Sequence, residues 1–178
     1  MKLYQPAEDS FFLAECAKHY CGNIALEIGA GSGIILNILS QNFNSVVGTD
    51  IDYVSLQYYK SNLPKNGALV CCNAASALAV KFDFIVSNPP YLSDHDKKNK
   101  DHTIDGGPTG IEATLHFIHS AVLVLQKRGK ILTIISSLSN SAKLDKFIKE
   151  MNLKKRTVKV RKLFFETLSI IEISFDVA

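Results

Sequence analysis

The sequence lacks any long hydrophobic run, and this absence sets the first limit on the class of protein. Hydrophobic residues make up 47% of the 178 positions, yet no stretch approaches the roughly 20 consecutive apolar residues of a membrane-spanning helix. Residues 1–6 do not resemble the hydrophobic segment of a signal peptide. We therefore expect a cytoplasmic protein that does not bind membranes, with residues 1–178 folded as a single domain.

Cysteine is scarce and the net charge is small, which bears on metal sites, redox sites and nucleic acid partners. The four cysteines, Cys16, Cys21, Cys71 and Cys72, match neither a zinc site nor a redox Cys-x-x-Cys motif in their spacing. We therefore expect free thiols and no bound metal. The formal net charge of +3 neither requires nor excludes a nucleic acid partner.

The motif Asn88-Pro89-Pro90-Tyr91 is the most informative candidate site in the sequence. It follows the apolar run 82–87, a predicted buried strand, and two prolines cannot continue a strand. Asn88 is thus expected at the carboxyl end of a strand, where open α/β sheets place active sites. The side-chain oxygen of Asn88 and the carbonyl oxygen of Pro89 can accept both hydrogens of a planar amine, while the Tyr91 ring covers its face. Taken alone, the motif is equally consistent with a simple turn.

A glycine-rich turn upstream predicts a nucleotide-type site. The apolar run 24–28 leads into Gly29-Ala30-Gly31-Ser32-Gly33, and a helical run, 34–39, follows. A strand, a glycine-rich turn and a helix let the backbone approach a ligand closely. The next predicted strand, 45–50, ends in Asp50, about 20 residues past the glycines, where an acid takes ribose hydroxyls.

The glycine loop differs from the dinucleotide fingerprint. The third glycine of the fingerprint Gly-x-Gly-x-x-Gly would fall at position 34, where this sequence has Ile34. Glu27, two residues before the first glycine, would repel a pyrophosphate and attract a sulfonium or an ammonium group. The charge pattern therefore favours S-adenosylmethionine over NAD.

Two further segments supply candidate ligand-binding residues. Residues 6–9 contain a proline and two acids, a composition typical of a helix start, and Asp9 and Ser10 can face a ligand there. The run 68–72 is a predicted third strand ending at Asn73, whose side-chain oxygen can accept a hydrogen bond from an adenine amine.

Between and beyond these motifs the sequence is less specific. The charged stretch 92–104 is predicted to be a solvated loop or a lid over the site. Thr109 and Glu112 fit a capping box at a helix start. On that helix, His116 and His119 lack an obvious third metal ligand, so we interpret them as structural.

The last third of the chain completes a predicted Rossmann-like α/β sheet, mostly parallel with one antiparallel strand. The expected elements are a strand at 130–135, a helix at 144–151 and an antiparallel pair at 157–164 and 167–175. Basic residues at 154–156 and 161–162 form a flank that is either a solvated face or a contact with an RNA-bound partner.

Several of these stretches together resemble the HemK-type class I methyltransferases. The resemblance rests on residues 4–13, on 26–33, on Thr49-Asp50, on Asn88-Pro89-Pro90-Tyr91 and on Asp105-Gly106-Gly107. It covers nearly the whole chain, and the opening Tyr-Gln-Pro-Ala-Glu-Asp-Ser is similar to the short archaeal and eukaryotic branch. That branch lacks the N-terminal domain of the bacterial release-factor enzymes, for which this chain has no room.

The resemblance implies a seven-stranded fold, a reaction and a set of site residues. The reaction is methylation of the glutamine amide in the Gly-Gly-Gln motif of a class I peptide chain release factor. The implied cofactor-site residues are Asp9, Ser10, Glu27, Gly29, Gly31, Asp50, Asn73 and Ala74. Asn88 and the Pro89 carbonyl would grip the amide, with Pro90 and Tyr91 beside it. Asn73 departs from the acid that is usual in the family.

The resemblance also implies a small zinc-binding activator subunit. If the run 68–72 is an apolar edge strand, it offers such a partner a pairing surface. Two other functions stay open at this point. One is methylation of adenine N6 or guanine N2 in DNA or RNA with the base flipped out, and the other is a non-catalytic binding module on the same fold. Lysine is a further possible acceptor.

Overall fold

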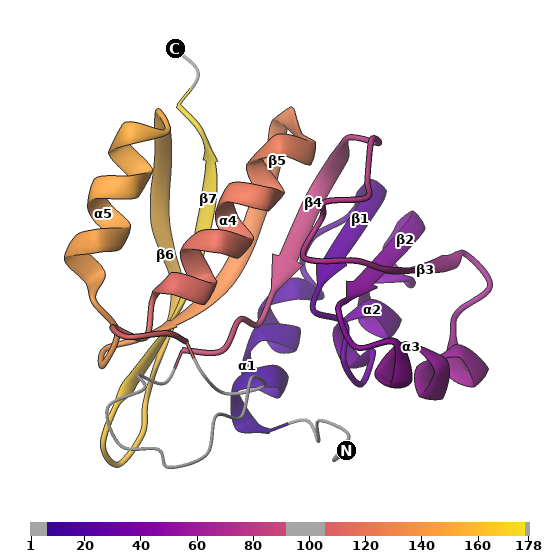
Figure 1. Cartoon of the computed structure of the whole chain (residues 1–178), viewed down its shortest axis with the longest axis horizontal. Helices are drawn as coiled ribbons and strands as arrows, with labels where there is room; N and C mark the ends of the chain where they lie inside the picture. Colours follow the sequence, from indigo (N-terminus) through magenta and orange to yellow (C-terminus); the bar gives the residue numbers. More distant parts are fainter. Residues whose placement is uncertain (1–6, 92–105, 177–178) are drawn as a thin grey trace.

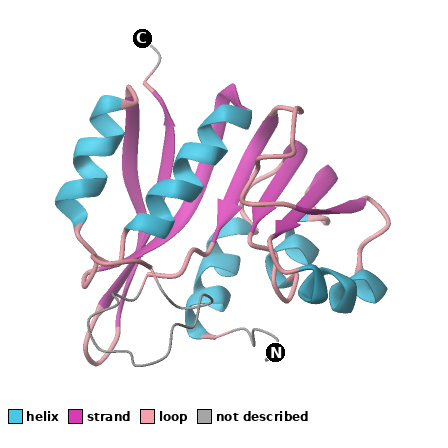
Figure 2. Cartoon of the chain, in the orientation of Figure 1, coloured by secondary structure: helices cyan, strands magenta, loops and turns pink. Residues whose placement is uncertain are grey.

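A central sheet of seven strands, covered by helices on both faces, forms the body of the protein in the computed structural model (Figures 1 and 2). The structure describes residues 7–91 and 106–176. The elements are α1 Glu8–Ala17, β1 Gly22–Ile28, α2 Ile34–Leu39, β2 Phe43–Asp50, α3 Tyr53–Tyr59, a 3-10 turn Lys60–Asn62, β3 Gly67–Cys71, β4 Phe82–Ser87, α4 Glu112–Val124, β5 Leu125–Ser136, α5 Ser141–Glu150, β6 Leu153–Lys162 and β7 Thr167–Phe175.

The strand order β3-β2-β1-β4-β5-β7-β6 confirms the predicted mostly parallel sheet. Strands β1 to β5 pair in parallel with one another, whereas β7 is antiparallel to both β5 and β6. The chain switches direction across the sheet between β1 and β4, and open α/β sheets bind ligands at such a switch point. Ile28 and Ser87, the last residues of these two strands, are register partners, so the loops that follow them start side by side.

Two apolar clusters, one on each face of the sheet, hold the helices in place. Side chains of α1, α2 and α3, including Phe12, Leu36 and Tyr59, pack on one face. Side chains of α4 and α5, including Ile118 and Leu144, pack on the other. These buried residues recur at helical spacing in the sequence, which is why the helices form where the apolar pattern predicts them.

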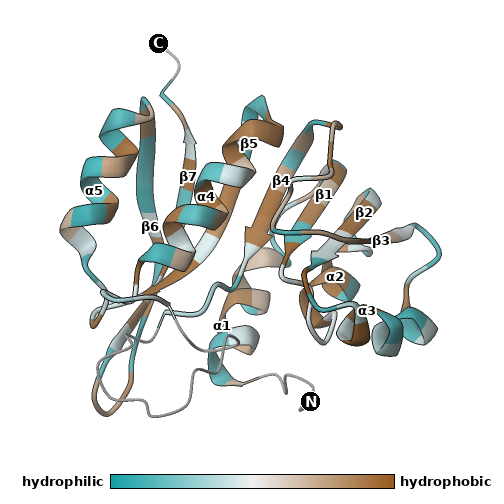
Figure 3. Ribbon diagram, in the orientation of Figure 1, coloured by the Kyte–Doolittle hydropathy of each residue, from teal (hydrophilic) through white to brown (hydrophobic). Residues whose placement is uncertain are grey.

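Several predicted boundaries are wrong at the edges of the sheet. The third strand is 67–71 rather than 68–72, and the strand predicted at 157–164 is β6, at 153–162. β6 is an edge strand with mostly exposed, charged side chains, and Figure 3 shows it largely in teal. Lysine-rich edges protect sheets against unwanted pairing, but they hide the alternation that identifies a strand.

Two helix starts also differ from the predictions. The helix predicted at 144–151 begins at Ser141, where the side chain of Asn140 caps it by accepting from the backbone N–H of Lys143. The capping box is confirmed only in part. The Glu112 side chain accepts from the backbone N–H of Thr109 at 3.0 Å, as predicted. The Thr109 hydroxyl, however, donates to Glu112 at 2.6 Å instead of accepting from the helix, and α4 begins after Ile111.

The basic flank is largely paired with acids. Arg156 donates two hydrogen bonds to the buried carboxylate of Glu172, at 2.8 and 2.9 Å, and the Tyr20 hydroxyl donates to the same group at 2.6 Å. Lys159 and Arg161 reach Glu15 of α1. Burial would raise the pKa of Glu172, but the bonds from Arg156 and Tyr20 outweigh it and lower that pKa. These pairs tie β6 and β7 to α1.

Candidate active site

The candidate site lies at the carboxyl edge of the sheet, where the loops after β1 and β4 begin. Gly29 follows β1 and Asn88 follows β4, directly after the paired residues Ile28 and Ser87. The structure thus brings together the two motifs that stood out in the sequence. The segment 92–104, predicted to be a loop or lid beside them, lies outside the described residues.

The side chain of Asn88 is held by α1 through its amide nitrogen. Nδ2 donates to Oγ of Ser10 at 3.1 Å and to Oδ2 of Asp9 at 3.3 Å. Oδ1 of Asn88 is buried and has no hydrogen-bond partner among the described residues. Because buried acceptors are nearly always satisfied, this oxygen is a candidate acceptor for a donor group of a ligand.

Asp9 connects the start of α1 with both ends of the motif. Its carboxylate accepts from the backbone N–H of Ser10 at 2.6 Å and from the Tyr91 hydroxyl at 3.2 Å, besides Nδ2 of Asn88. Asp9 and Ser10 were predicted to contact a cofactor. In the structure the hydrogen bonds named here orient Asn88 and Tyr91, and contact with a cofactor stays a prediction.

Gly106 and Ser139 support the Pro90-Tyr91 backbone from behind. A Cβ on Gly106 would lie 2.8 Å from Cα of Tyr91 and 2.9 Å from the Pro90 carbonyl oxygen, so only glycine fits there. The hydroxyl of Ser139 donates to the Tyr91 carbonyl at 3.3 Å. Ser139 was not predicted, because no local motif joins it to position 91.

The glycine loop wraps around the end of β2. The backbone N–H groups of Gly29 and Ala30 both donate to the carbonyl of Thr49 at 2.8 Å. Gly29, Gly31 and Gly33 all have positive φ, from +49° to +76°, which favours glycine at these positions. At Gly29 an added Cβ would have, among the residues that the structure describes, only the Phe117 ring as a close neighbour, at 3.5 Å. The backbone is therefore open to a ligand on that side.

Asp50 fixes the same loop from the next strand. One carboxylate oxygen accepts from the N–H of Gly31 and the other from that of Asp52, both at 2.9 Å. Each oxygen keeps a second lone pair for a further donor, and ribose binding by Asp50 stays a prediction. Ile51, which sequence analysis missed, is 74% exposed directly after it.

Glu27 lies beneath the loop rather than on its surface. It is 3% exposed, and its Oε2 accepts from the backbone N–H of Leu36 in the first turn of α2 at 2.8 Å. Burial raises the pKa of Glu27 well above its usual range, and the nearby Asp50 raises it further, while the Leu36 N–H opposes the shift. A cation bound above the loop would favour the ionised form.

Asn73 has an unexpected neighbour. Its Oδ1 lies 2.8 Å from Nε2 of His116 on α4, so His116, interpreted from the sequence as structural, contacts a candidate site residue. Ala74 follows in the left-handed region, with φ of +49°, and the Ser120 hydroxyl accepts from the N–H of Ala75 at 2.9 Å. These contacts hold the turn after β3 against α4.

No cluster of metal-binding side chains occurs in the parts of the chain that the structure describes. The four cysteines are unpaired, and Cys16 is buried in the core. None of the described helices is long and apolar enough to cross a membrane.

Comparison with known protein families shows to which family this chain belongs. The model of the methyltransferase small domain matches residues 8–163. The chain belongs to the methyltransferase small domain family. Members of this family are methyltransferases, which implies S-adenosylmethionine as the methyl donor, and the sheet described above matches class I methyltransferase structures.

Individual relatives cover the chain to different extents. A Methanocaldococcus jannaschii protein with the provisional name protein N5-glutamine methyltransferase is 29% identical, over 96% of this chain and 90% of that protein. A release factor glutamine methyltransferase of Bradyrhizobium diazoefficiens is 32% identical, over 60% of this chain and 41% of that protein.

A solved structure is similar over the whole length. It is the E. cuniculi Mtq2-Trm112 complex, responsible for the methylation of the eRF1 translation termination factor. The similarity covers 99% of this chain and 100% of that chain, with a TM-score of 0.80 and 26% identity.

Proposed function

We propose that this protein is an S-adenosylmethionine-dependent N-methyltransferase acting in the cytoplasm on the glutamine side-chain amide of the Gly-Gly-Gln motif in a class I peptide chain release factor. The observation that carries the proposal is the buried, unpartnered Oδ1 of Asn88. Leaving a buried acceptor unpaired costs free energy, which an N–H donor of the substrate would recover. The names of three of the similar proteins, which concern glutamine and eRF1, support the same substrate class.

The fixed orientation of the Asn88 amide favours a substrate with two N–H groups. The Ser10 hydroxyl donates to Asp9, so both groups that contact Nδ2 of Asn88 act as acceptors. Turning the amide over would set its oxygen against those acceptors, and Oδ1 therefore keeps the accepting role. With the carbonyl of Pro89 as second acceptor, the site would bind both hydrogens of one –NH2 group.

The same pair of acceptors would promote the reaction. An amide nitrogen is a poor nucleophile because its lone pair is conjugated with the carbonyl group. Hydrogen bonds to Asn88 and Pro89 would raise the electron density on nitrogen and aim it at the methyl group. When bound, S-adenosylmethionine would supply that methyl group from its sulfonium, and the methylated amide would lose its proton to solvent.

The residues of the glycine loop fit S-adenosylmethionine. The side of Gly29 that is open to a ligand gives the backbone access to the donor. In the proposed arrangement Asp50 would bind the ribose, Asn73 the adenine amine, and the exposed Ile51 would cover the adenine face. The charge of ionised Glu27, beneath the loop, would favour the cationic end of the donor.

A small zinc-binding activator subunit is proposed to bind at the β3 edge. β3 is the outermost strand on its side of the sheet, as predicted, so its outer backbone groups are available for pairing. On the neighbouring α3, Tyr53, Val54 and Tyr58 are between 54% and 66% exposed. The similar E. cuniculi protein was solved as a complex with Trm112, which supports a partner of this kind.

The test is methyl transfer from labelled S-adenosylmethionine, with and without the candidate activator. The acceptors offered are the release factor, its form with Gln→Ala in the Gly-Gly-Gln motif, a lysine-rich protein, duplex DNA and RNA. We expect label on the intact factor alone. Label on a nucleic acid would identify a nucleobase methyltransferase instead. Failure to bind S-adenosylmethionine with the activator present would favour a non-catalytic module. Either result overturns the proposal.

A further inference from the structure

The turn between β6 and β7 carries the two most exposed aromatic side chains in the described parts of the chain. Phe164 is 95% exposed and Phe165 86%, and their rings meet at 63° with centroids 5.2 Å apart. The turn is closed by a backbone hydrogen bond of 2.8 Å from Leu163 to Glu166. Polar residues and glycine are usual in such turns, so the fold does not explain the two phenyl rings.

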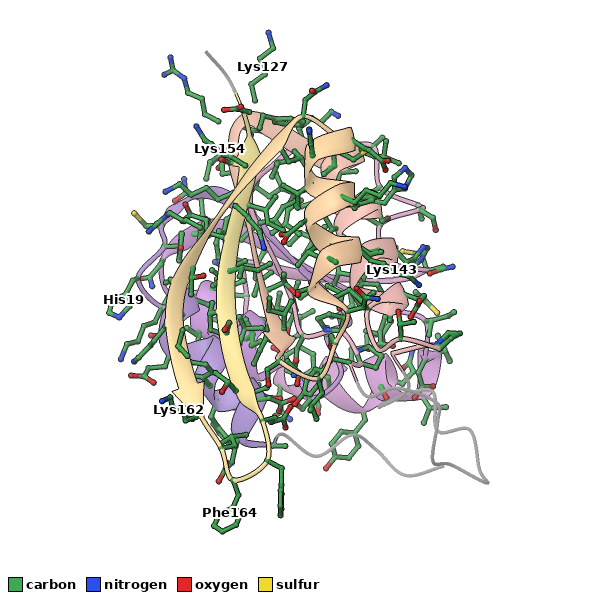
Figure 4. All side chains as sticks on the ribbon, turned by 90° about the vertical axis from the view of Figure 1, so that its left-hand side faces the viewer. His19, Lys127, Lys143, Lys154, Lys162 and Phe164 are labelled. Carbon is green, nitrogen blue, oxygen red and sulfur yellow. The ribbon has the colours of Figure 1, made fainter. Side chains whose placement is uncertain are left out.

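These rings project from the same edge of the sheet as Asn88. β6 runs in the same direction as β4, because β5 is parallel to β4 and β7 is antiparallel to both β5 and β6. The turn after β6 therefore lies at the carboxyl edge, as Figure 1 shows. In Figure 4, Phe164 stands at the tip of the hairpin and points away from the body of the protein.

Hydrogen bonds connect the hairpin to the Asn88 loop. At its base, Thr167 and Ser137 exchange two hydrogen bonds of 2.9 Å, one between backbones and one from the Thr167 N–H to the Ser137 hydroxyl. Two residues further on, Ser139 donates to the carbonyl of Tyr91. The hairpin is thus fixed to the loop that supports the candidate active site, so a molecule bound to both would be held in one orientation.

We propose that Phe164 and Phe165 dock an apolar patch on the folded domain of the protein substrate, outside its reacting glutamine. This inference rests on the proposed function. The two rings form a tilted wedge, which suits a depression in a protein surface better than two parallel faces would, and stacked bases prefer parallel faces. The exposed Lys162 beside the turn favours a patch with an acidic neighbour. Adjacent exposed aromatic residues of this kind are frequent binding hot spots.

The test compares the double variant F164S/F165S with the wild-type chain, each in complex with its activator. The substrates are the folded release factor and a short peptide spanning the Gly-Gly-Gln motif. We expect the KM for the factor to rise about 30-fold, with unchanged kcat/KM for the peptide. Leu123→Ala is the matched control, since Leu123 is 61% exposed at the C-terminal end of α4. It should leave both substrates unaffected.

Each other outcome overturns the inference in a distinguishable way. An unchanged KM for the factor refutes the docking role alone and leaves the proposed function intact. Equal losses on factor and peptide mean that the hairpin supports the active site instead of docking. Loss of RNA affinity with normal use of the factor identifies RNA as the occupant. A wild-type chain that neither binds nor methylates the factor would refute both the inference and the proposed function.

Discussion

The hydroxyl of Ser10 accepts a hydrogen bond from Nδ2 of Asn88 at 3.1 Å, although the two residues are 78 positions apart in the sequence. Ser10 is 3% exposed, so water cannot easily replace it. The first helix thereby determines which end of the Asn88 amide would face the proposed substrate. In this sense α1 belongs to the candidate active site, as well as to the core through Phe12.

Replacing Asn88 and Ser10 separately should distinguish the proposed acceptor, Asn88, from the residue that orients its amide, Ser10. Asn88→Ala removes the acceptor, and we expect kcat to fall about 100-fold or more, with the affinity for S-adenosylmethionine changed less than twofold. Ser10→Ala removes one support of the amide, and we expect a fall in kcat of about tenfold. Single-turnover methylation and calorimetric binding of the donor measure the two effects. Equal losses in rate and donor affinity for Asn88→Ala would refute its assigned role.

Two substitutions in the glycine loop, Gly33→Ala and Gly29→Ala, should separate an effect on stability from an effect on cofactor binding. In Gly33→Ala the new Cβ would lie 2.1 Å from the ring of Tyr59, and φ is +72°, so we expect a loss of more than about 2 kcal/mol in the free energy of unfolding. In Gly29→Ala the Cβ meets nothing closer than 3.5 Å, and the strain of positive φ should cost about 1 kcal/mol.

The affinity for S-adenosylmethionine should be affected more strongly in Gly29→Ala than the stability is. Gly29→Ala fills the side that is open to a ligand, so we expect at least a tenfold loss of S-adenosylmethionine affinity from a protein that is still well folded. Urea unfolding and calorimetry on the same samples test the pair. A well-folded Gly29→Ala protein with wild-type affinity would exclude contact between the donor and this side of the loop.

Stability in acid should depend on Glu112. Burial would raise its pKa, but hydrogen bonds from Thr109 and Lys143 outweigh that effect and lower the pKa to about 2. A carboxylate with a lowered pKa stabilises the folded state above its ordinary pKa, 4.5, and this stabilisation is lost as the pH falls toward 2. We expect Glu112→Gln to unfold at lower urea concentration than wild type at pH 7. The difference should vanish near pH 2, and a constant difference would contradict the assignment.

The activator edge can be tested without touching the active site. Tyr53→Lys with Tyr58→Lys places two charges on the exposed face of α3, and we expect at least a tenfold loss of activator affinity because buried charges without partners are costly. Leu138→Lys, at another exposed apolar position, serves as the control. Size-exclusion chromatography of mixed samples gives the result. Normal complex formation by the double variant would place the activator elsewhere.

Local sequence patterns were sufficient to predict the core of the sheet and the order of its loops. The glycine turn and the two prolines after Asn88 determine backbone shape within a few residues, and strand direction follows from their alternation with helices. The pairing of Asp9 and Ser10 with Asn88 could not be predicted in this way, because it depends on how α1 packs against the sheet. The contact of His116 with Asn73 also joins separate elements.

The errors have a common physical origin. β6 was placed too late because its exposed lysines show no apolar alternation, and its pairing comes from β7. Glu112 accepts from the backbone N–H of Thr109, as its spacing to that residue predicted, but it also accepts from the Thr109 hydroxyl and from Lys143. In both places the missed feature is a contact with a separate element, β7 for β6 and Lys143 for Glu112, which a local pattern does not show.

The proposed activator and substrate surfaces lie at opposite ends of the same sheet. β3 and β6 are its two outermost strands, and six intervals of about 4.8 Å separate them by roughly 29 Å. Two macromolecules on these edges need not compete for space, so they can bind in either order. The activator can then remain bound while one release factor after another is modified, and the turnover number would be independent of the activator's dissociation rate.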